Sequence, residues 1–292
     1  MVLARLAGQR APVCLYGAQN IEKRFPPPFR WIERATLRRA AGVHTCNEEA
    51  GAILRRKGFS GRIRDLGLGV DLVRFAPPDD SIDDSSDDSS DDSIDGAAGP
   101  AGDGSASGDG CALRVGYVGR LEPHKGVEVL VAAVAATPGT ELEIVGGGPS
   151  HAAVVDAVER SGASGRVRLS GFVDPDQLAG IYRRFDVVAV PSLETPSWIE
   201  QFGRVALEAM ASGVAVVVSD SGSLPEVVAD AGLLVPPGDV DALAAALARL
   251  RDQPEERARL AGAGRRRAAR YGWDQVAARQ IDLYRTVVED WS

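Results

Sequence analysis

From residue 113 onward, short apolar runs alternate with longer segments of helical periodicity, and this alternation constrains the fold more than any other sequence feature. The short runs predict strands over residues 113–118, 141–145, 167–170, 186–190, 215–219 and 232–235. The longer segments predict helices over residues 127–136, 150–161, 177–185, 203–211, 224–229 and 240–252. Apolar strands that alternate with helices are typical of a parallel sheet covered on both faces. We therefore expect a complete Rossmann-like α/β domain over residues 111–270.

A shorter version of the same alternation precedes residue 79. Strands are expected over residues 11–16, 43–46 and 62–66, and helices over residues 29–41 and 48–57. These few units predict only a partial α/β domain over residues 1–78, and a final helix is expected over residues 271–292.

Residues 79–110 have a different composition, with eleven Asp and neither Lys nor Arg. Near-repeats of Asp-Asp-Ser-Ser pass into a stretch rich in Gly, Ala and Ser. Low hydrophobicity combined with like charge cannot offset the entropy of the chain, so we predict a disordered acidic linker. A tail that binds a basic partner is the alternative, and a solvated spacer is favoured over it.

This acidic segment also accounts for the formal charge of −8. Without it, 33 basic residues face 30 acidic ones (41 minus 11), and this near-neutral balance argues against a nucleic-acid partner. Cys14, Cys46 and Cys111 lie far apart, which argues against a zinc site or disulfide framework and fits a cytoplasmic protein. No apolar stretch reaches the ~18 residues of a membrane-spanning helix.

The first segment with recognisable chemistry follows the expected strand at 113–118. Gly119 allows a tight backbone turn beside a ligand, and Arg120 and Lys125 place two cations around that turn. A diphosphate needs such cations, most of all as a leaving group that gains charge. A strand-end loop with two surface cations explains the same residues equally well.

A second segment carries two carboxylates, Glu200 just before the expected helix at 203–211 and Glu208 within it. Gln201, Phe202 and Gly203 would offer backbone N–H groups to an anion at the helix N-terminus. Eight helical residues span about 12 Å, close to the length of a sugar, a diphosphate and a ribose in a row. One carboxylate would accept hydrogen bonds from a sugar and the other from a ribose diol. Two ordinary acids near a helix start are the alternative.

Two further strand ends carry weaker signals. Gly146-Gly147-Gly148-Pro149 is a glycine-rich turn without the GxGxxG or GxxxxGK[ST] spacing. Gly171-Phe172-Val173 would lie beside a nucleotide base, although a packing phenylalanine explains it equally well. No metal-ligand set is apparent, and His44, His124 and His151 are not assigned as general bases.

In their order along the chain, these segments resemble the retaining nucleotide-sugar glycosyltransferases of the GT-B class that carry a Glu-x7-Glu motif (glycosyl transferases group 1). The resemblance is dense from residue 113 to the end. The similar segments are Gly119-Arg120-Leu121, Lys125-Gly126, Ile144-Val145-Gly146, Gly171-Phe172-Val173, Pro191-Ser192, 200–213, Ser219-Asp220-Ser221-Gly222, Pro225-Glu226 and Gly232-Leu233-Leu234-Val235. Tyr271-Gly272-Trp273 and the last helix are similar to the family's tail, which crosses back to the first domain.

The resemblance implies a metal-independent reaction in which the anomeric configuration is retained. Arg120 and Lys125 would hold the donor diphosphate and stabilise it as the leaving group, and Glu200 would hold sugar hydroxyls. No cofactor is implied, because the nucleoside-diphosphate sugar is itself the donor substrate.

The resemblance also implies a set of donor-binding residues. Gly119 would let the backbone approach the donor, and Phe202 and Gly203 would offer backbone N–H groups. Glu208 would bind the ribose, and Val173 would lie beside the base.

The N-terminal part departs from the family. Residues 11–20, 29–54 and 67–75 resemble the later part of the acceptor domain, and its first β/α units are absent. Where the family carries a histidine near the acceptor, this chain has Gln19 and Asn20. The acceptor, whether glycan, lipid or small molecule, stays open, and so does a peripheral contact with the inner face of the membrane.

This departure leaves two hypotheses for function. The first is a retaining, hexosyltransferase-like enzyme with a complete donor site. The second is an inactive remnant, or the donor-binding subunit of a split enzyme that needs a partner chain. An epimerase or a sugar phosphorylase on the same fold is disfavoured, because neither the acid–base set of the former nor the cofactor lysine of the latter is found.

Overall fold

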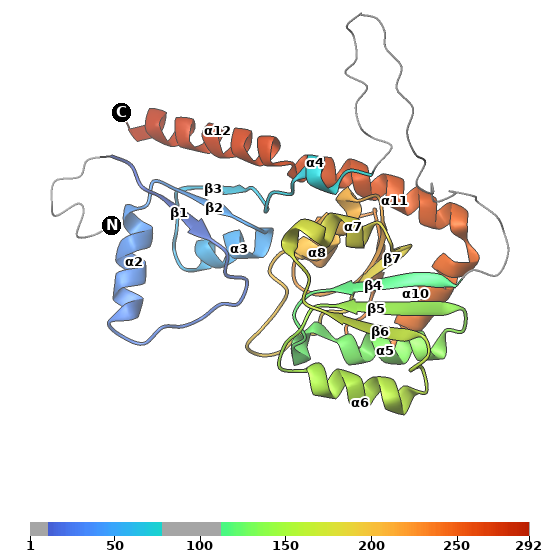
Figure 1. The fold of residues 1–292 in the computed structure, drawn as a ribbon. Helices are drawn as coiled ribbons and strands as arrows, with labels where there is room; N and C mark the ends of the chain where they lie inside the picture. The colour runs from blue at the N-terminus through green and yellow to red at the C-terminus, as the bar shows by residue number, and fades with distance from the viewer. Residues whose placement is uncertain (1–10, 78–111, 292) are drawn as a thin grey trace, which may run out of the picture.

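The computed structural model describes residues 11–77 and 112–291, which form two α/β units (Figure 1). Within these residues, the N-terminal unit (11–77) holds a three-stranded parallel sheet and the C-terminal unit (112–271) a six-stranded one. The α/β class with parallel sheets is thus confirmed. The linker predicted at 79–110 lies outside the described residues.

All strands of the C-terminal sheet run parallel, in the spatial order β6-β5-β4-β7-β8-β9. They are β4 (Leu113–Val118), β5 (Thr140–Val145), β6 (Val167–Gly171), β7 (Val187–Val190), β8 (Ala215–Ser219) and β9 (Leu233–Val235). Each begins and ends within about one residue of the range that the apolar runs predict. The order reverses between β4 and β7, which creates a topological switch point at the centre of the sheet.

Two hydrophobic cores lie on opposite faces of this sheet, because successive side chains of a strand point to opposite faces. In β8, Ala215 and Val217 join one core while Val216 and Val218 join the other. The first core lies under α5 (Val127–Ala136), α6 (His151–Ser161) and α10 (Val240–Asp252). The second lies under α7 (Leu178–Tyr182), α8 (Arg204–Ala211) and α9 (Leu224–Val228). This double burial explains why the strands read as continuous valine-rich runs.

Two helical segments differ from expectation. The helix predicted over 177–185 is a 3-10 turn, η3 (Pro175–Gln177), followed by the short helix α7, so its range was wrong. Helix α11 (Pro254–Ala268) was not predicted, because its many arginines hide a narrow buried stripe of Leu260, Gly264 and Ala268. These three positions recur every four residues, which places them on one helix face.

The N-terminal unit has a small core. Its strands are β1 (Cys14–Gly17), β2 (Gly42–Thr45) and β3 (Arg62–Asp65), and its helices are α2 (Phe29–Arg39), α3 (Glu48–Arg56) and α4 (Leu72–Phe75). The last helix, α12 (Trp273–Trp291), runs back from the C-terminal unit and packs on β2 and β3 (Figure 1). Gly42 leaves room for the Val287 side chain at this contact.

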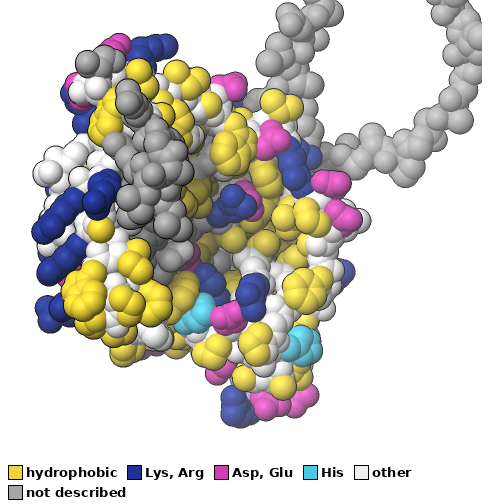
Figure 2. Space-filling view, turned by 90° about the vertical axis from the view of Figure 1, so that its left-hand side faces the viewer, with side chains coloured by type: hydrophobic (Ala, Val, Ile, Leu, Met, Phe, Trp, Pro, Cys, Tyr) yellow, Lys and Arg dark blue, Asp and Glu magenta, His cyan; other side chains and the backbone are white. Residues whose placement is uncertain are grey.

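Apolar side chains remain exposed on the N-terminal unit and on α12. Viewed from the side of α2, they form several clusters among basic side chains (Figure 2). On α12, the exposed residues Ile281, Tyr284, Val288 and Trp291 recur every three or four residues and form a stripe. Strand β1 pairs only with β2 among the described residues, so its outer edge is open there.

Candidate functional site

The predicted site residues gather at one edge of the C-terminal sheet. Because its strands are parallel, their carboxyl ends share that edge. Gly119 follows β4, Val173 comes shortly after β6, and the loop that reaches Glu200 and Gly203 leaves β7. Strands β4 and β7 are neighbours, and ligands of such sheets bind in the crevice at this switch point. The fold therefore assembles the predicted residues where a ligand is expected.

Lys125 and Glu200 form an ion pair at this crevice. The Lys125 Nζ lies 2.8 Å from Glu200 Oε2, which also accepts a hydrogen bond from Ser192 Oγ at 3.0 Å. Lys125 ends the 3-10 turn η2 (Pro123–Lys125), and a Cβ at Gly126 would overlap the carbonyl oxygen of Pro191. Because Gly126 has no side chain, the turn that carries Lys125 can pack directly against the loop that follows β7.

An indole ring covers the lysine. The Lys125 Nζ lies 4.4 Å from the centroid of the Trp198 ring, which is the geometry of a cation–π contact. The imidazole of His124 stacks on the same indole, with centroids 3.9 Å apart. Burial and the charge of Lys125 lower the pKa of His124, which favours the neutral imidazole.

Arg120 lies apart from this pair. Its Nη2 is 2.7 Å from Glu122 Oε1, and its side chain is 73% exposed. Its carbonyl oxygen accepts a hydrogen bond from the Tyr117 hydroxyl at 2.7 Å, which fixes the backbone but not the guanidinium. The structure thus brings Lys125 and Glu200 together, whereas Arg120 pairs with Glu122.

The N-terminus of α8 opens at the same crevice. Gly203 is the residue before the helix and has a φ of 81°, a left-handed conformation that favours glycine. Phe202 is buried, with its ring 5.7 Å from that of Tyr271, so its side chain is part of the core. Within the described residues, the N–H groups of Gln201, Phe202 and Gly203 donate to no other group. These amides therefore have no protein acceptor there, and their role in binding an anion stays a prediction.

Glu208 lies one turn inside α8 and has a separate partner. Its Oε2 accepts a hydrogen bond from the Tyr182 hydroxyl at 2.9 Å. Burial raises the pKa of Glu208, whereas the Tyr182 hydrogen bond opposes that rise. The carboxylate is thus oriented by Tyr182, and it forms no hydrogen bond or ion pair with Lys125 or Glu200, which both lie in the described ranges.

The glycine-rich turn after β5 has a structural explanation. A Cβ at Gly146 would overlap the carbonyl oxygen of Gly119, and a Cβ at Gly148 would overlap that of Leu121. Both glycines therefore permit the backbone after β5 to approach the backbone after β4. Val173 is half-buried against the core, whereas the neighbouring Phe172 is 79% exposed and lies over Gly147.

Several residues of the site had no assigned role in the sequence. Ser192 lies in a segment that resembles the family, and Trp198 lies between two predicted features, but neither spacing indicates its partner. Tyr182 carries no recognisable signal, because its contact with Glu208 arises only when α7 packs on α8.

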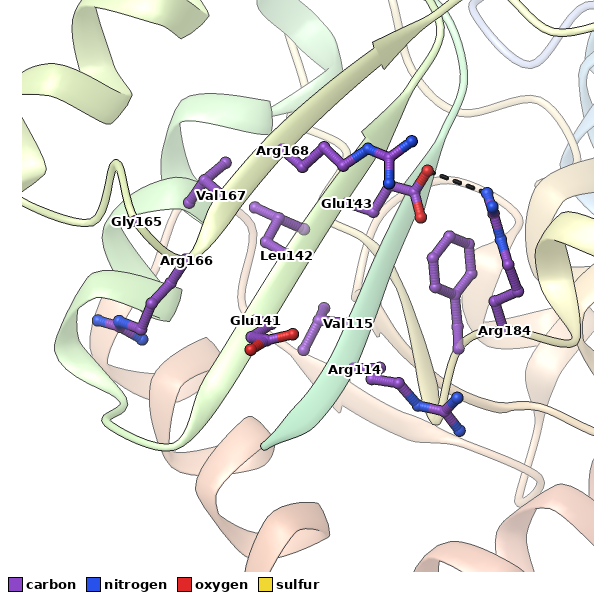
Figure 3. A pocket seen from close by; sticks show the side chains of 11 residues that line it. Arg114, Val115, Glu141, Leu142, Glu143, Gly165, Arg166, Val167, Arg168 and Arg184 are labelled. Carbon is purple, nitrogen blue, oxygen red and sulfur yellow. Dashed lines mark hydrogen bonds and ion pairs between the residues drawn. The ribbon is translucent and has the colours of Figure 1, made fainter. Parts of the chain in front are cut away.

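A hollow of about 460 Å³ lies on the face of the sheet rather than at its carboxyl edge (Figure 3). Charged residues of β4, β5 and β6 line it, and Arg184 pairs with Glu143 at 3.0 Å across its wall. Arg114 at its other end pairs with Asp186 at 2.9 Å. None of the predicted site residues lies in this hollow, and we assign it no role in donor binding.

Neither a metal cluster nor a membrane span was found in the part of the chain that the structure describes. No three His, Cys, Asp or Glu side chains in residues 11–77 and 112–291 are grouped so that they could hold a metal ion. No helix in the same ranges is long and apolar enough to cross a membrane.

Comparison with known proteins decides the family. The sequence model of the glycosyl transferases group 1 family matches residues 112–267, more than half of the chain. The chain belongs to this family. The matched range contains every residue predicted for the site, from Gly119 to Glu208.

Curated relatives extend the likeness into the N-terminal unit. A D-inositol 3-phosphate glycosyltransferase of Corynebacterium glutamicum is 39% identical over 186 residues, covering 60% of this chain and 43% of that protein. D-inositol 3-phosphate glycosyltransferase 2 of Catenulispora acidiphila is 33% identical over 264 residues, covering 85% of this chain and 56% of that protein. The chain thus spans about half the length of the curated relatives it matches.

Solved structures confirm the GT-B-like fold. Sucrose-phosphate synthase from Thermosynechococcus elongatus has a TM-score of 0.69 at 30% identity, over 90% of this chain and 62% of that chain. Anabaena HepE, solved in complex with UDP, has a TM-score of 0.74 at 20% identity, over 96% of this chain and 73% of that chain. The second likeness concerns the fold alone.

Proposed function

We propose that this chain binds a nucleoside-diphosphate sugar at the carboxyl edge of its C-terminal sheet and transfers the sugar with retention of configuration. One observation carries the proposal: Lys125, Glu200 and the N-terminus of α8 meet at the switch point between β4 and β7. Membership of the glycosyl transferases group 1 family supports it. Among proteins of the same fold, HepE was solved with UDP.

The cations serve the departure of the nucleoside diphosphate. When the bond from the anomeric carbon to the phosphate oxygen breaks, negative charge grows on that oxygen. The Lys125 ammonium and the free amides before α8 are preorganised to stabilise that charge. Arg120 joins them once its exposed guanidinium turns from Glu122 towards the diphosphate. No metal ion is needed in this scheme, because these groups supply the positive charge.

The carboxylates hold the two ends of the donor. Glu200 accepts hydrogen bonds from sugar hydroxyls while it stays paired with Lys125. Glu208 accepts hydrogen bonds from the ribose diol while it stays paired with Tyr182. Val173 and the backbone beside it lie near the base. Glu200 already accepts from Lys125 and Ser192, and Glu208 from Tyr182, so the position of each carboxylate does not depend on the ligand.

Calorimetric titration of the purified chain with UDP-glucose, GDP-mannose and ADP-glucose tests donor binding. We expect one of these to bind and its parent nucleoside diphosphate to compete. NMR of the product formed with a simple sugar acceptor then gives the anomeric configuration, expected to match that of the donor. Absence of binding by every donor would sink the proposal, and an inverted product would refute retention.

A second candidate is a donor-binding subunit that works with a partner chain. Two features favour it: among the described residues β1 pairs on one edge only, and α12 carries an exposed apolar stripe. Under this candidate the purified chain binds the donor but forms no product until a second chain is added. Product formation by a monomer, checked by light scattering, would argue against it.

A further inference from the structure

Two asparagines of the N-terminal unit contact the loop that carries Glu200. Asn20 Nδ2 donates to the carbonyl oxygen of Glu200 at 2.7 Å, and Asn47 Nδ2 donates to that of Gln201 at 2.6 Å. Both side chains are buried, with 8% and 1% of their surface exposed. These are contacts between units, because Asn20 and Asn47 lie in residues 11–77 whereas the loop follows β7.

The same two carbonyl oxygens accept from Ser223 on the other side. The Ser223 N–H donates to Glu200 O at 3.1 Å, and Ser223 Oγ donates to Gln201 O at 2.8 Å. A carbonyl oxygen has two lone pairs, so both lone pairs of each oxygen are engaged, and Gln201 O is also approached by the weak donor Cys46 Sγ at 3.9 Å. Two consecutive peptide groups are thus held from both sides, by the N-terminal unit and by the turn after β8.

This clamp sets the direction of the amides that follow. In a trans peptide the N–H points opposite to the carbonyl of the preceding residue. Fixing Glu200 O and Gln201 O therefore turns the N–H groups of Gln201 and Phe202 away from the asparagines. Neither N–H donates to another group within the described residues. The same clamp fixes the Cα of Glu200, whose carboxylate pairs with Lys125.

We propose that Asn20 and Asn47 are positioning residues of the donor site. Their amide groups hold the 200–201 backbone so that the Glu200 carboxylate and the following N–H groups are in place before a donor binds. The inference rests on the proposed function. It means that the N-terminal unit helps to build the donor site, although every residue expected to touch the donor belongs to the C-terminal unit.

Asn47 offers a variant that isolates the clamp. Its Oδ1 accepts from Ala50 N at 2.7 Å and caps α3, while its Nδ2 reaches Gln201. Asn47→Asp keeps the cap, because Asp caps helices as well as Asn does, and it removes the donor to Gln201 O. Asn20→Asp removes the donor to Glu200 O in the same way. Gln275→Glu, on the exposed face of α12, is the control for the added charge.

The experiment uses the full chain and two ligands: whichever of UDP-glucose, GDP-mannose and ADP-glucose the unmodified chain binds best, and its nucleoside monophosphate. We expect each asparagine variant to weaken binding of the nucleotide sugar about tenfold. Binding of the monophosphate, which lacks the sugar and its attached phosphate, should change less than about twofold. Gln275→Glu should change neither affinity. Equal weakening of both ligands indicates a general structural role and overturns the inference, as does no weakening of either.

Hydrogen exchange followed by mass spectrometry supplies a readout that needs no ligand. We expect faster exchange of the amides after Glu200 in both asparagine variants, with β7 and β8 unchanged. If the amides after Glu200 exchange at the same rate as in the unmodified chain, or if exchange is faster throughout the chain, the inference that the asparagines hold this backbone is wrong. If the unmodified chain binds no nucleotide sugar, the proposed function fails while this exchange measurement still decides the clamp.

Discussion

The two units of this chain differ in how completely they are built. Every side chain of β7 and β8 in the C-terminal sheet is buried, whereas β3 in the N-terminal sheet has mostly exposed side chains. Exposed aromatic residues gather on the N-terminal unit and on α12, which covers it. The more completely buried sheet and every residue proposed to bind the donor thus belong to the C-terminal unit. The N-terminal unit contributes through two buried asparagines at the contact between the units.

The largest contrast is expected from two lysines, one in each unit. Lys125 pairs with Glu200 at 2.8 Å, and Lys57 pairs with Glu33 at 2.6 Å. We expect Lys125→Ala to lower the rate of sugar transfer roughly 100- to 1,000-fold, because a preorganised charge opposite the leaving group is lost. Lys57→Ala should leave the rate unchanged. Steady-state kinetics with a radiolabelled donor checks both variants. Similar rates for the two would contradict the proposal that the catalytic charge lies on Lys125 and not on Lys57.

A smaller effect is expected at the ribose end of the donor. Glu208→Gln should weaken donor binding about 10- to 100-fold, because hydrogen bonds to a charged acceptor are lost. Burial raises the pKa of Glu208, so binding by the native chain should also weaken as the pH falls and this carboxylate takes up a proton. Calorimetric titration at several pH values checks both statements.

Tyr182→Phe is the matched control for this carboxylate. It keeps the buried ring and removes only the hydroxyl that donates to Glu208 at 2.9 Å. We expect a smaller loss of affinity than in Glu208→Gln, since the carboxylate remains. A larger loss would mean that the hydroxyl, and not Glu208, contacts the donor.

The sequence could predict the C-terminal strands closely because valine-rich runs between glycines leave few alternatives. Parallel strands share a carboxyl edge, so placing the strands also placed Gly119, Glu200 and Gly203 together. The roles of these residues in donor binding remain predictions. What the motifs could not show is which side chains pair. The contact of Trp198 with Lys125 depends on how two separate loops pack.

The N-terminal contribution was harder to predict for a physical reason. Asn20 and Asn47 are isolated polar residues, and their hydrogen bonds to residues 200 and 201 form only when the two units are in contact. The departure from the family near the acceptor, at Gln19 and Asn20, stays a prediction, and the structure adds that Asn20 donates a hydrogen bond to the backbone carbonyl of Glu200. Helix α11 was missed because its apolar stripe is one residue wide among arginines.

The cost of replacing a glycine of positive φ by alanine can be compared between the two units. Gly203 has a φ of 81°, and a Cβ there would overlap the Leu224 side chain, whereas Gly58 has a φ of 88° and open space around it. Gly58→Ala should cost about 1–2 kcal/mol from backbone strain alone. Gly203→Ala should cost about 2–4 kcal/mol, because overpacking adds to that strain. Urea unfolding gives the free energy of unfolding of both variants. Equal losses of this free energy would mean that the side chains around α8 rearrange to accept the added methyl group at little cost.

The smallest expected effect concerns pH and the contact between the units. Burial, together with a hydrogen bond to Asp65, raises the pKa of Glu226 from 4.5 to about 7. Glu226 Oε2 also accepts from the backbone N–H of Glu48 at 3.2 Å, so this carboxyl lies between the units. The folded chain binds more protons here than the unfolded one between these two pKa values. The stabilisation is therefore full below about pH 4.5 and is lost as the pH rises through about 7.

Glu226→Gln tests this linkage, because glutamine is neutral at every pH and keeps an oxygen for the Glu48 N–H. In the native chain, the free energy of unfolding should fall by on the order of 1 kcal/mol between pH 5 and pH 8, a value discounted for the partial exposure of Glu226. Glu226→Gln should remove that part of the decline, whereas Glu128→Gln on the exposed face of α5 should not. Urea unfolding across this pH range gives the slopes. An unchanged slope in Glu226→Gln would show that the contact between the units does not depend on this proton.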